Sequence, residues 1–222
     1  MTSPAVPPAV PVAHGPVKPV RAFAITVMAA LGFSALLLLV EEMVDLWALS
    51  LAGGTSQRFH TLMNLHDAML LFIAVGFLGS AVSMMAWMWR SRSNAQTIND
   101  TPHQWGRPWI IIGWLVPLLN LVVPRRIVGD IWTAVAPGRR PVLVNVWWVL
   151  WLVYFVSDTV VDRFGDGTTR DSLRAQLQGY AVTTPIGIAA AALAIVMIWR
   201  ISRLQEEHAT RIAQAIAAPA PA

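Results

Sequence analysis

The chain has 222 residues, of which 56% are hydrophobic and 13% charged, with a formal net charge of +4 and a mean hydropathy of +0.56. Soluble domains are typically about 45–50% apolar and about a quarter charged, so this composition excludes an ordinary soluble domain and predicts a polytopic helical membrane protein. The basic residues flank apolar runs, which predicts helix orientation in a membrane and argues against nucleic-acid binding.

Two spans are predicted after a proline-rich tail. Residues 1–17 contain five prolines and no charged residue, which predicts a disordered tail. Apolar runs at about 22–40 and 68–89 each have the length of a transmembrane helix. Small residues at four-residue spacing predict close contacts with other helices: Thr26, Ala30 and Ser34 in the first span, and Gly76 with Ser80 and Gly79 with Ser83 in the second.

Acidic residues follow the first span and histidines precede the second. Glu41 and Asp45 share a helical face, which would suit a cation site or a proton relay. The simpler interpretation is that these acids, with Glu42, mark the aqueous end of the span. His60 and His66 do not have the usual spacing of metal ligands, and the chain has no cysteine. We therefore expect neither a metal site nor a cofactor.

The second span ends in a group of aromatic and basic residues. Trp87, Trp89, Arg90 and Arg92 lie within six positions of one another. Tryptophan followed by arginine is typical of the membrane interface, because the amphipathic indole ring lies at head-group level. These four residues are therefore predicted to anchor the end of the helix.

The central segment is the least regular part of the chain. The run 109–123 has only fifteen residues, about 22 Å of helix, which is short for a span. Pro117 removes a backbone hydrogen bond in its middle, and Asn120 would need a partner in hydrocarbon. After Pro124 the apolar residues fall on one helical face. We therefore expect a re-entrant or interfacial segment at 108–136.

Two further spans are predicted at about 142–161 and 180–199. The polar stretch between them superficially resembles a calcium-binding loop, but it lacks the ligand pattern of an EF-hand. A polar helical and flexible C-terminal tail is expected at 206–222. Residues 18–205 are thus predicted to form a single helical membrane domain.

The distribution of charge distinguishes a four-span from a five-span arrangement. If 109–123 crosses the membrane, eight basic residues lie on each side and no bias remains. If it turns back, twelve of the sixteen share a side with both termini. We therefore expect an all-α integral membrane protein with four transmembrane helices plus this re-entrant or interfacial segment, with five transmembrane helices as the alternative. Both termini are then cytoplasmic.

The chain resembles a bacterial membrane-protein family catalogued as domain of unknown function 4328. The residues that carry the resemblance lie between about 65 and 205, and they are Trp89, Arg90, Asn94, Trp114, Pro117, Asn120, Pro124, Trp132, Trp147 and Trp148. One difference is Leu115, where an aromatic residue is expected in this family. The resemblance implies the membrane class and brings no catalytic residues. An arginine-rich composition with abundant alanine, proline and glycine also indicates a GC-rich, bacterial genome, and hence the bacterial cytoplasmic membrane.

The function predicted from the sequence is non-enzymatic. No paired carboxylates or nucleophile with a base is visible, so no catalytic residue is assigned. The favoured hypothesis is a partner- or lipid-binding or sensing protein that acts through its cytoplasmic Arg/Trp-rich side, at Arg125, Arg126, Arg139 and Arg140. Membrane lipids are the expected partners, with a protein partner or a homo-oligomer joined through the small-residue faces. The alternative is a small transporter or channel subunit lined by the broken segment 108–124.

Overall fold

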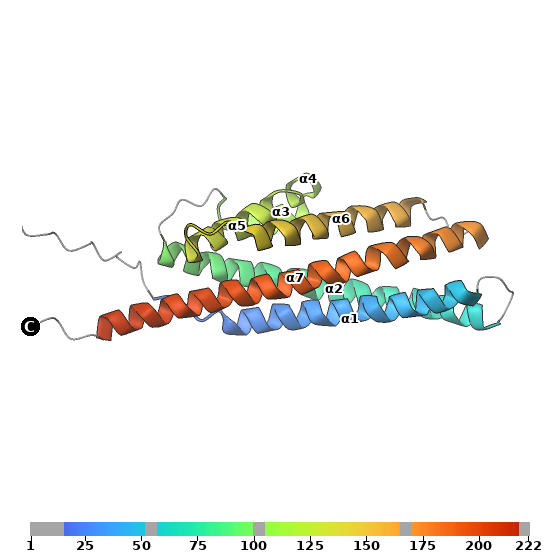
Figure 1. The fold of residues 1–222 in the computed structure, drawn as a ribbon, viewed down its shortest axis with the longest axis horizontal. Coiled ribbons are helices and arrows are strands. Elements are labelled where there is room, and N and C mark those ends of the chain that lie inside the picture. Colours follow the sequence, from blue (N-terminus) through green and yellow to red (C-terminus); the bar gives the residue numbers. More distant parts are fainter. Residues whose placement is uncertain (1–15, 52–56, 100–104, 165–169, 218–222) are drawn as a thin grey trace, which may run out of the picture.

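The computed structural model describes residues 16–51, 57–99, 105–164 and 170–217, and these fold into helices without any strand. Four long helices form the body of the molecule (Figure 1): α1 (Arg21–Leu51), α2 (Gln57–Ile98), α6 (Val142–Phe164) and α7 (Arg170–Ala217). Three short helices connect α2 to α6: α3 (Trp109–Leu115), α4 (Pro117–Asn120) and α5 (Val123–Val135). The four long helices are each long and apolar enough to cross a membrane.

The outer surface of the bundle is apolar. Large hydrophobic side chains are exposed along the long helices, including Phe33, Leu71, Val149 and Val182, each more than half exposed. A soluble protein rarely leaves so much contiguous apolar surface in water, whereas lipid chains cover it in a bilayer. The prediction of an all-α integral membrane protein is confirmed.

The helices extend beyond the predicted spans. Helix α1 continues eleven residues past position 40, and α7 includes both the predicted span 180–199 and the polar residues up to 217. The polar stretch expected as a loop between the last two spans is largely helical as well; its residues 165–169 lie outside the described residues. Hydropathy marks only the lipid-facing part of a helix. Polar residues that face a neighbouring helix can extend a helix, but they do not raise its hydropathy.

The long helices form an incomplete ring. Helix α1 packs against α2 and α7, and α7 packs against α6, but in the described residues α2 and α6 do not pack on each other. At one end of the bundle α5 lies between α2 and α6 and contacts both. The first residues of α1 and the last turns of α7 lie toward that same end (left in Figure 1). The core there is the larger of the two hydrophobic clusters, and it includes Val27, Trp87, Ile131 and Ile198.

The segment between α2 and α6 is a hairpin. Val116 is extended between α3 and α4, and the two parts of the segment meet at an angle of 110°. Pro117 begins α4, where its missing N–H costs no helical hydrogen bond. The chain enters and leaves at the same end of the bundle (Figure 1), so four long helices plus a re-entrant segment describe the fold.

Candidate functional site

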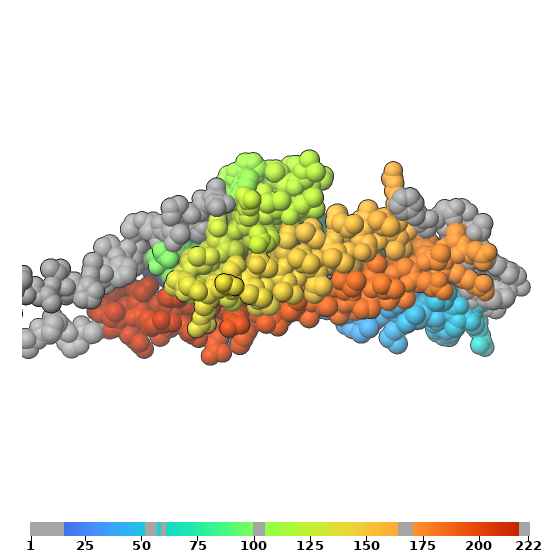
Figure 2. Space-filling view, turned by 45° about the horizontal axis from the view of Figure 1, so that its top comes forward, coloured from blue at the N-terminus to red at the C-terminus, as the bar shows by residue number. Residues whose placement is uncertain are grey.

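The close approach of the two arms of the hairpin depends on Gly113. A Cβ atom on Gly113 would lie 2.6 Å from Cγ1 and 2.9 Å from Cβ of Val123, at the start of α5. Only glycine allows this contact without a shift, since real Cβ atoms are never so close to other carbons. Beyond the contact the tip of the hairpin protrudes from the bundle, with Leu115 72% and Leu118 79% exposed (Figure 2). These side chains are suited to hydrocarbon and not to water.

Tryptophans attach the hairpin to α6. The Trp114 ring makes edge contacts with Trp148 and Trp151, at centroid distances of 6.4 and 5.7 Å, and Trp148 stacks on Trp151 at 4.8 Å. The Trp148 Nε1 atom donates a hydrogen bond to the Leu121 carbonyl, 3.1 Å away. That carbonyl follows a helix break, so the indole satisfies a backbone group that lipid could not. A cluster of tryptophans thus holds the re-entrant segment against α6.

Helix α5 buries one face and leaves its other face in a polar groove. Val123, Pro124, Ile127, Val128, Ile131 and Trp132 are buried. The groove is lined by Arg125, Arg126, Gly129, Asp130, Thr133, Pro141 and Asn145. Arg125 donates a hydrogen bond of 2.7 Å from Nη2 to Oδ1 of Asn145, which orients its guanidinium group between α5 and α6. Arg126 is exposed beside it. The helix thus presents two neighbouring cationic groups, one held by Asn145 and one exposed.

The turn after α5 carries the other two predicted basic residues. Arg139 and Arg140 are exposed, and the carbonyl of Arg139 accepts a hydrogen bond of 3.1 Å from Nε1 of Trp132. The guanidinium of Arg200, on α7, lies 5.7 Å from the Trp132 ring centroid. Trp132 therefore ties this turn to α7, but the structure does not place Arg139 and Arg140 among the lining residues of the groove.

Asn94 connects three parts of the chain at this end of the bundle. It is buried, its Oδ1 accepts from the backbone N–H of Lys18 at 3.0 Å, and its Nδ2 donates to the Lys18 carbonyl at 2.8 Å. Nδ2 also lies 3.3 Å from Oε1 of Gln205, whose Nε2 donates to the Ser91 carbonyl at 2.9 Å. The family-like Asn94 is therefore placed as a structural clamp between α2, α7 and the chain before α1.

The prediction of interfacial anchors is wrong for two of the four residues, Trp87 and Arg92. Trp87 is fully buried and donates a hydrogen bond from Nε1 to Ser202 of α7, and Arg92 is only 2% exposed. Arg92 interacts electrostatically with Asp130 of α5. Trp89 is exposed as expected, and Arg90 lies over the ring of Phe23. Helix α2 continues past the predicted end of the span. Some of the residues there therefore face the bundle interior, and others face outward.

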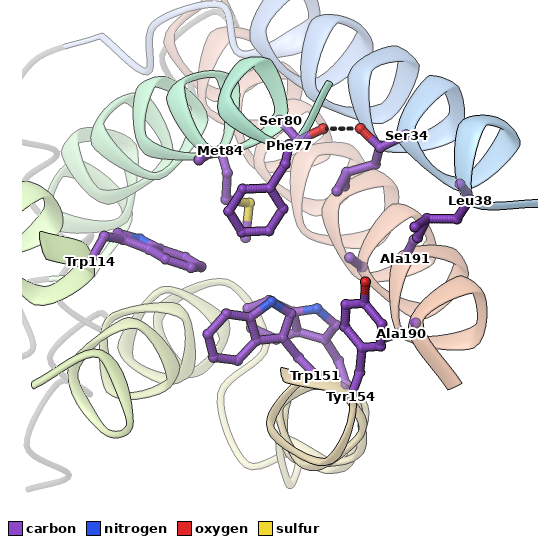
Figure 3. A pocket seen from close by; sticks show the side chains of 16 residues that line it. Ser34, Leu38, Phe77, Ser80, Met84, Trp114, Trp151, Tyr154, Ala190 and Ala191 are labelled. Atoms are coloured by element: carbon purple, nitrogen blue, oxygen red, sulfur yellow. Dashed lines mark hydrogen bonds between the residues drawn. The ribbon is translucent and has the colours of Figure 1, made fainter. Parts of the chain in front are cut away.

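An apolar cavity lies beside the hairpin, in the gap between α2 and α6. Its volume is about 100 Å³, and its walls include Phe77 of α2, Trp114 of the hairpin, and Trp151 and Tyr154 of α6 (Figure 3). Small residues of α7, among them Ala191, form its floor. Ser34 of α1 and Ser80 of α2 hydrogen-bond to each other at one edge, at 3.0 Å. Ser34 and Ser80, which belong to the predicted small-residue faces of the first two spans, thus meet within the chain.

Carboxylates, a histidine and a tyrosine meet at the other end of the gap. The Nδ1 atom of His66 lies 2.8 Å from Oδ1 of Asp45 and 3.8 Å from Oε1 of Glu41. The ring of Tyr180 lies 6.3 Å from that of His66, and its hydroxyl donates a hydrogen bond of 2.6 Å to Asp162. We call Glu41, Glu42, Asp45, His66, Asp158, Asp162 and Tyr180 the acid cluster.

The sequence offered a site at Glu41 and Asp45 only as the less favoured interpretation, and it did not predict the rest of the acid cluster. Glu42 and Asp45 are buried, at 8% and 2% exposure, so they do not mark the aqueous end of a span as expected. In the sequence, only the shared helical face of Glu41 and Asp45 indicated a site. No sequence pattern connected these two residues to His66. Among the described residues, no group of three His, Asp or Glu side chains is placed to hold a metal ion.

The predicted residues fall into two groups in space. Trp114, Pro117, Pro124, Trp147 and Trp148 meet around the hairpin, together with Asn120, whose Oδ1 is buried without a hydrogen-bond partner in the described structure. Trp89, Arg90 and Asn94 lie on the last turns of α2, where Asn94 acts as the clamp described above.

Comparison with known proteins agrees with the pattern of the central segment. A family model described as Domain of unknown function (DUF4328) matches residues 50–205. No curated protein and no solved structure matches the chain. The matched range runs from the last two residues of α1 to Gln205 of α7, and it includes the hairpin and its tryptophans. The chain belongs to the family of domain of unknown function 4328.

Proposed function

We propose that this membrane protein is non-enzymatic and binds anionic lipid head groups in the groove between α5 and α6. The observation that carries the proposal is the position of Arg125 and Arg126 on an amphipathic helix at one end of the bundle. An arginine near a membrane surface contributes on the order of 1 kcal/mol of attraction to anionic lipid. Its planar group also binds phosphate oxygens in pairs, which a lysine does not.

The surroundings of the groove support this role. The apolar face of α5 is buried in the bundle, so the helix is held in place before any lipid binds. Thr133 and Asn145 add polar side chains that can hydrogen-bond to a phosphate or glycerol group. Arg139 and Arg140 are exposed on the adjoining turn. By the positive-inside rule, this end of the bundle faces the cytoplasm in a bacterial membrane, and both termini lie there.

Lipid competition in nanodiscs tests the proposal. The purified protein is equilibrated in nanodiscs with equal amounts of phosphatidylglycerol and phosphatidylcholine, and the retained lipids are measured by native mass spectrometry. Arg125→Gln with Arg126→Gln removes about 2 kcal/mol of attraction, which is about a 30-fold loss of preference for phosphatidylglycerol. The matched control is Arg163→Gln with Arg174→Gln, which removes the same charge at the opposite end of the bundle.

Comparison with the control variant defines which result would contradict the proposal. If both double variants lower the retention of phosphatidylglycerol equally, the effect is one of net charge and the groove is not a site. An unchanged preference in the Arg125/Arg126 variant has the same consequence. Raising the salt concentration should weaken the wild-type preference, since exposed charges are screened.

A further inference from the structure

Exposed apolar side chains lie near the acid cluster on all four long helices. On α1, Glu42 and Asp45 face inward, while Met43 and Trp47 on the same turns are 64% and 57% exposed. The other three helices show exposed apolar side chains near the cluster: Leu65 on α2, Val160 on α6 and Val182 on α7. Ionisable groups surrounded by such a belt are costly in a membrane and indicate a functional site.

The acid cluster has an excess of carboxylates. Five carboxyl groups, from Glu41, Glu42, Asp45, Asp158 and Asp162, belong to the cluster, and its single histidine contacts two of them, those of Asp45 and Glu41. In the part of the chain that the structure describes, no lysine or arginine forms an ion pair with any of the five. A cation from outside the chain would therefore be attracted to the cluster.

Two buried oxygen atoms of the neighbourhood lack a hydrogen-bond partner among the described residues. The carboxyl group of Glu42 lies beside Thr184 of α7, and the Oε2 atom of Glu42 is buried and unpartnered. The Thr183 hydroxyl, on the next residue of α7, is also buried without a partner, and the residue is 4% exposed. Native proteins rarely leave such groups unsatisfied, so each is an open position for a ligand.

The cavity and the acid cluster adjoin along the same helix faces. On α1, Leu38 lines the cavity, and Glu41 and Glu42 follow it by about one turn, roughly 4.5–6 Å along the axis. On α6, Tyr154 lines the cavity and Asp158 follows it by the same interval.

We propose that the cavity and the acid cluster form one binding site for an amphipathic cation, with its alkyl chain in the cavity and its ammonium group among the carboxylates. The cavity is lined mainly by apolar atoms, and Phe77, Trp114 and Trp151 present aromatic rings to it (Figure 3). Aromatic faces also attract a cation that passes over them. A chain longer than the cavity extends between α2 and α6, which do not pack on each other.

The charge of the cluster distinguishes this ligand from others with the same chain. An anionic amphiphile would bring its head group against five carboxyl groups, and like charges in low dielectric repel strongly. A neutral alcohol would fill the cavity without using the carboxylates. The site is therefore distinct from the groove on α5, which is at the opposite end of the bundle and has the opposite charge.

Binding of dodecyltrimethylammonium tests the proposal directly. The full chain is placed in phosphatidylcholine nanodiscs, and the retention of the radiolabelled cation is measured and corrected with empty nanodiscs. Dodecyl sulfate and dodecanol, which have the same chain length, serve as competitors. We expect at least tenfold weaker competition from dodecyl sulfate than from unlabelled dodecyltrimethylammonium, with dodecanol between them.

Two variants separate the roles of the carboxylates and the cavity. Glu41→Gln with Asp45→Asn should weaken retention of the cation at least tenfold, and Asp171→Asn, an exposed acid on α7, is the control. Ala191→Phe fills the cavity without changing the carboxylates and should have a similar effect. Ala192→Phe adds the same volume on an exposed face of α7 and should not.

The outcomes decide the proposal even if one variant does not fold. Equal displacement by dodecyl sulfate, or full retention in a folded Ala191→Phe protein, would overturn it. Loss of retention in Ala191→Phe alone, with no effect of Glu41→Gln and Asp45→Asn in a folded protein, would also overturn it, since the cavity would then bind chains without regard to charge. Arg125→Gln with Arg126→Gln should leave retention of the cation unchanged, which separates this site from the proposed lipid groove.

Discussion

Substituting Gly113 by alanine tests the hairpin, because that residue allows α3 and α5 to approach. The new methyl group would lie 2.6 Å from Cγ1 and 2.9 Å from Cβ of Val123. Rotation about χ1 can move Cγ1 away, but it leaves Cβ in place, so the backbone of one arm has to shift. Val123 is itself 1% exposed, which leaves it little room to move.

The expected cost follows from these contacts. Overpacking of a well-packed site costs typically about 1–3 kcal/mol, and the fixed Cβ contact favours the upper end of that range. Replacing glycine in a helix returns up to about 1 kcal/mol, because the unfolded chain loses freedom. Gly113→Ala should therefore destabilise the protein by about 2 kcal/mol. Gly79→Ala on α2, where a Cβ meets nothing within 4 Å, should be neutral or stabilising by up to about 1 kcal/mol.

Both variants can be compared by equilibrium unfolding in mixed micelles, followed by tryptophan fluorescence. Trp114 should also become more accessible to a lipid-soluble quencher in Gly113→Ala, since it loses its place against Trp148. If the two alanine variants have the same free energy of unfolding within about 0.5 kcal/mol, the arms of the hairpin do not pack as described. A straight fifth span would give that result.

Two other contacts give independent predictions. Asn94→Ala removes three hydrogen bonds between α2, α7 and the chain before α1, two of them at 2.8 and 3.0 Å, and should lower the free energy of unfolding by about 2–3 kcal/mol. A loss below about 0.5 kcal/mol would show that this clamp is not formed. Trp148→Phe keeps the aromatic ring but leaves the Leu121 carbonyl without its donor, and should cost about 1–3 kcal/mol. Trp199→Phe, on an exposed position, is its control.

The sequence predicted the number of long helices and the hairpin because each has a local signal. Apolar runs of the right length mark the four spans, and Pro117 with the short run around it marks the break. The ends of the helices were less predictable. Helix α1 continues through Glu41 and Asp45 because these side chains face α2. There they contact His66, which lies twenty-one positions after Asp45 in the sequence.

Of the candidate sites, the sequence predicted those that have a local pattern and missed those that depend on contacts between distant residues. Arg125 and Arg126 follow directly from the amphipathic pattern of α5, so the groove could be anticipated. Arg92 has the same local context as an interfacial anchor, yet it is buried near Asp130, and only the return of α5 against α2 explains this. The cavity had no signal of its own. It exists because two helices far apart in the sequence fail to meet.

The hairpin accounts for that gap. Helix α5 takes the position between α2 and α6 at one end of the bundle and contacts both, so the two helices are held apart there. Trp114 then packs against Trp151 of α6 and closes the cavity on the side of the hairpin. Toward the other end the described residues of α2 and α6 do not pack on each other, and the acid cluster lies there, with Glu42 and Asp45 buried. In a closed four-helix bundle, the side chains of facing helices interdigitate and would fill this space. Because α5 separates α2 from α6, the cavity between them remains.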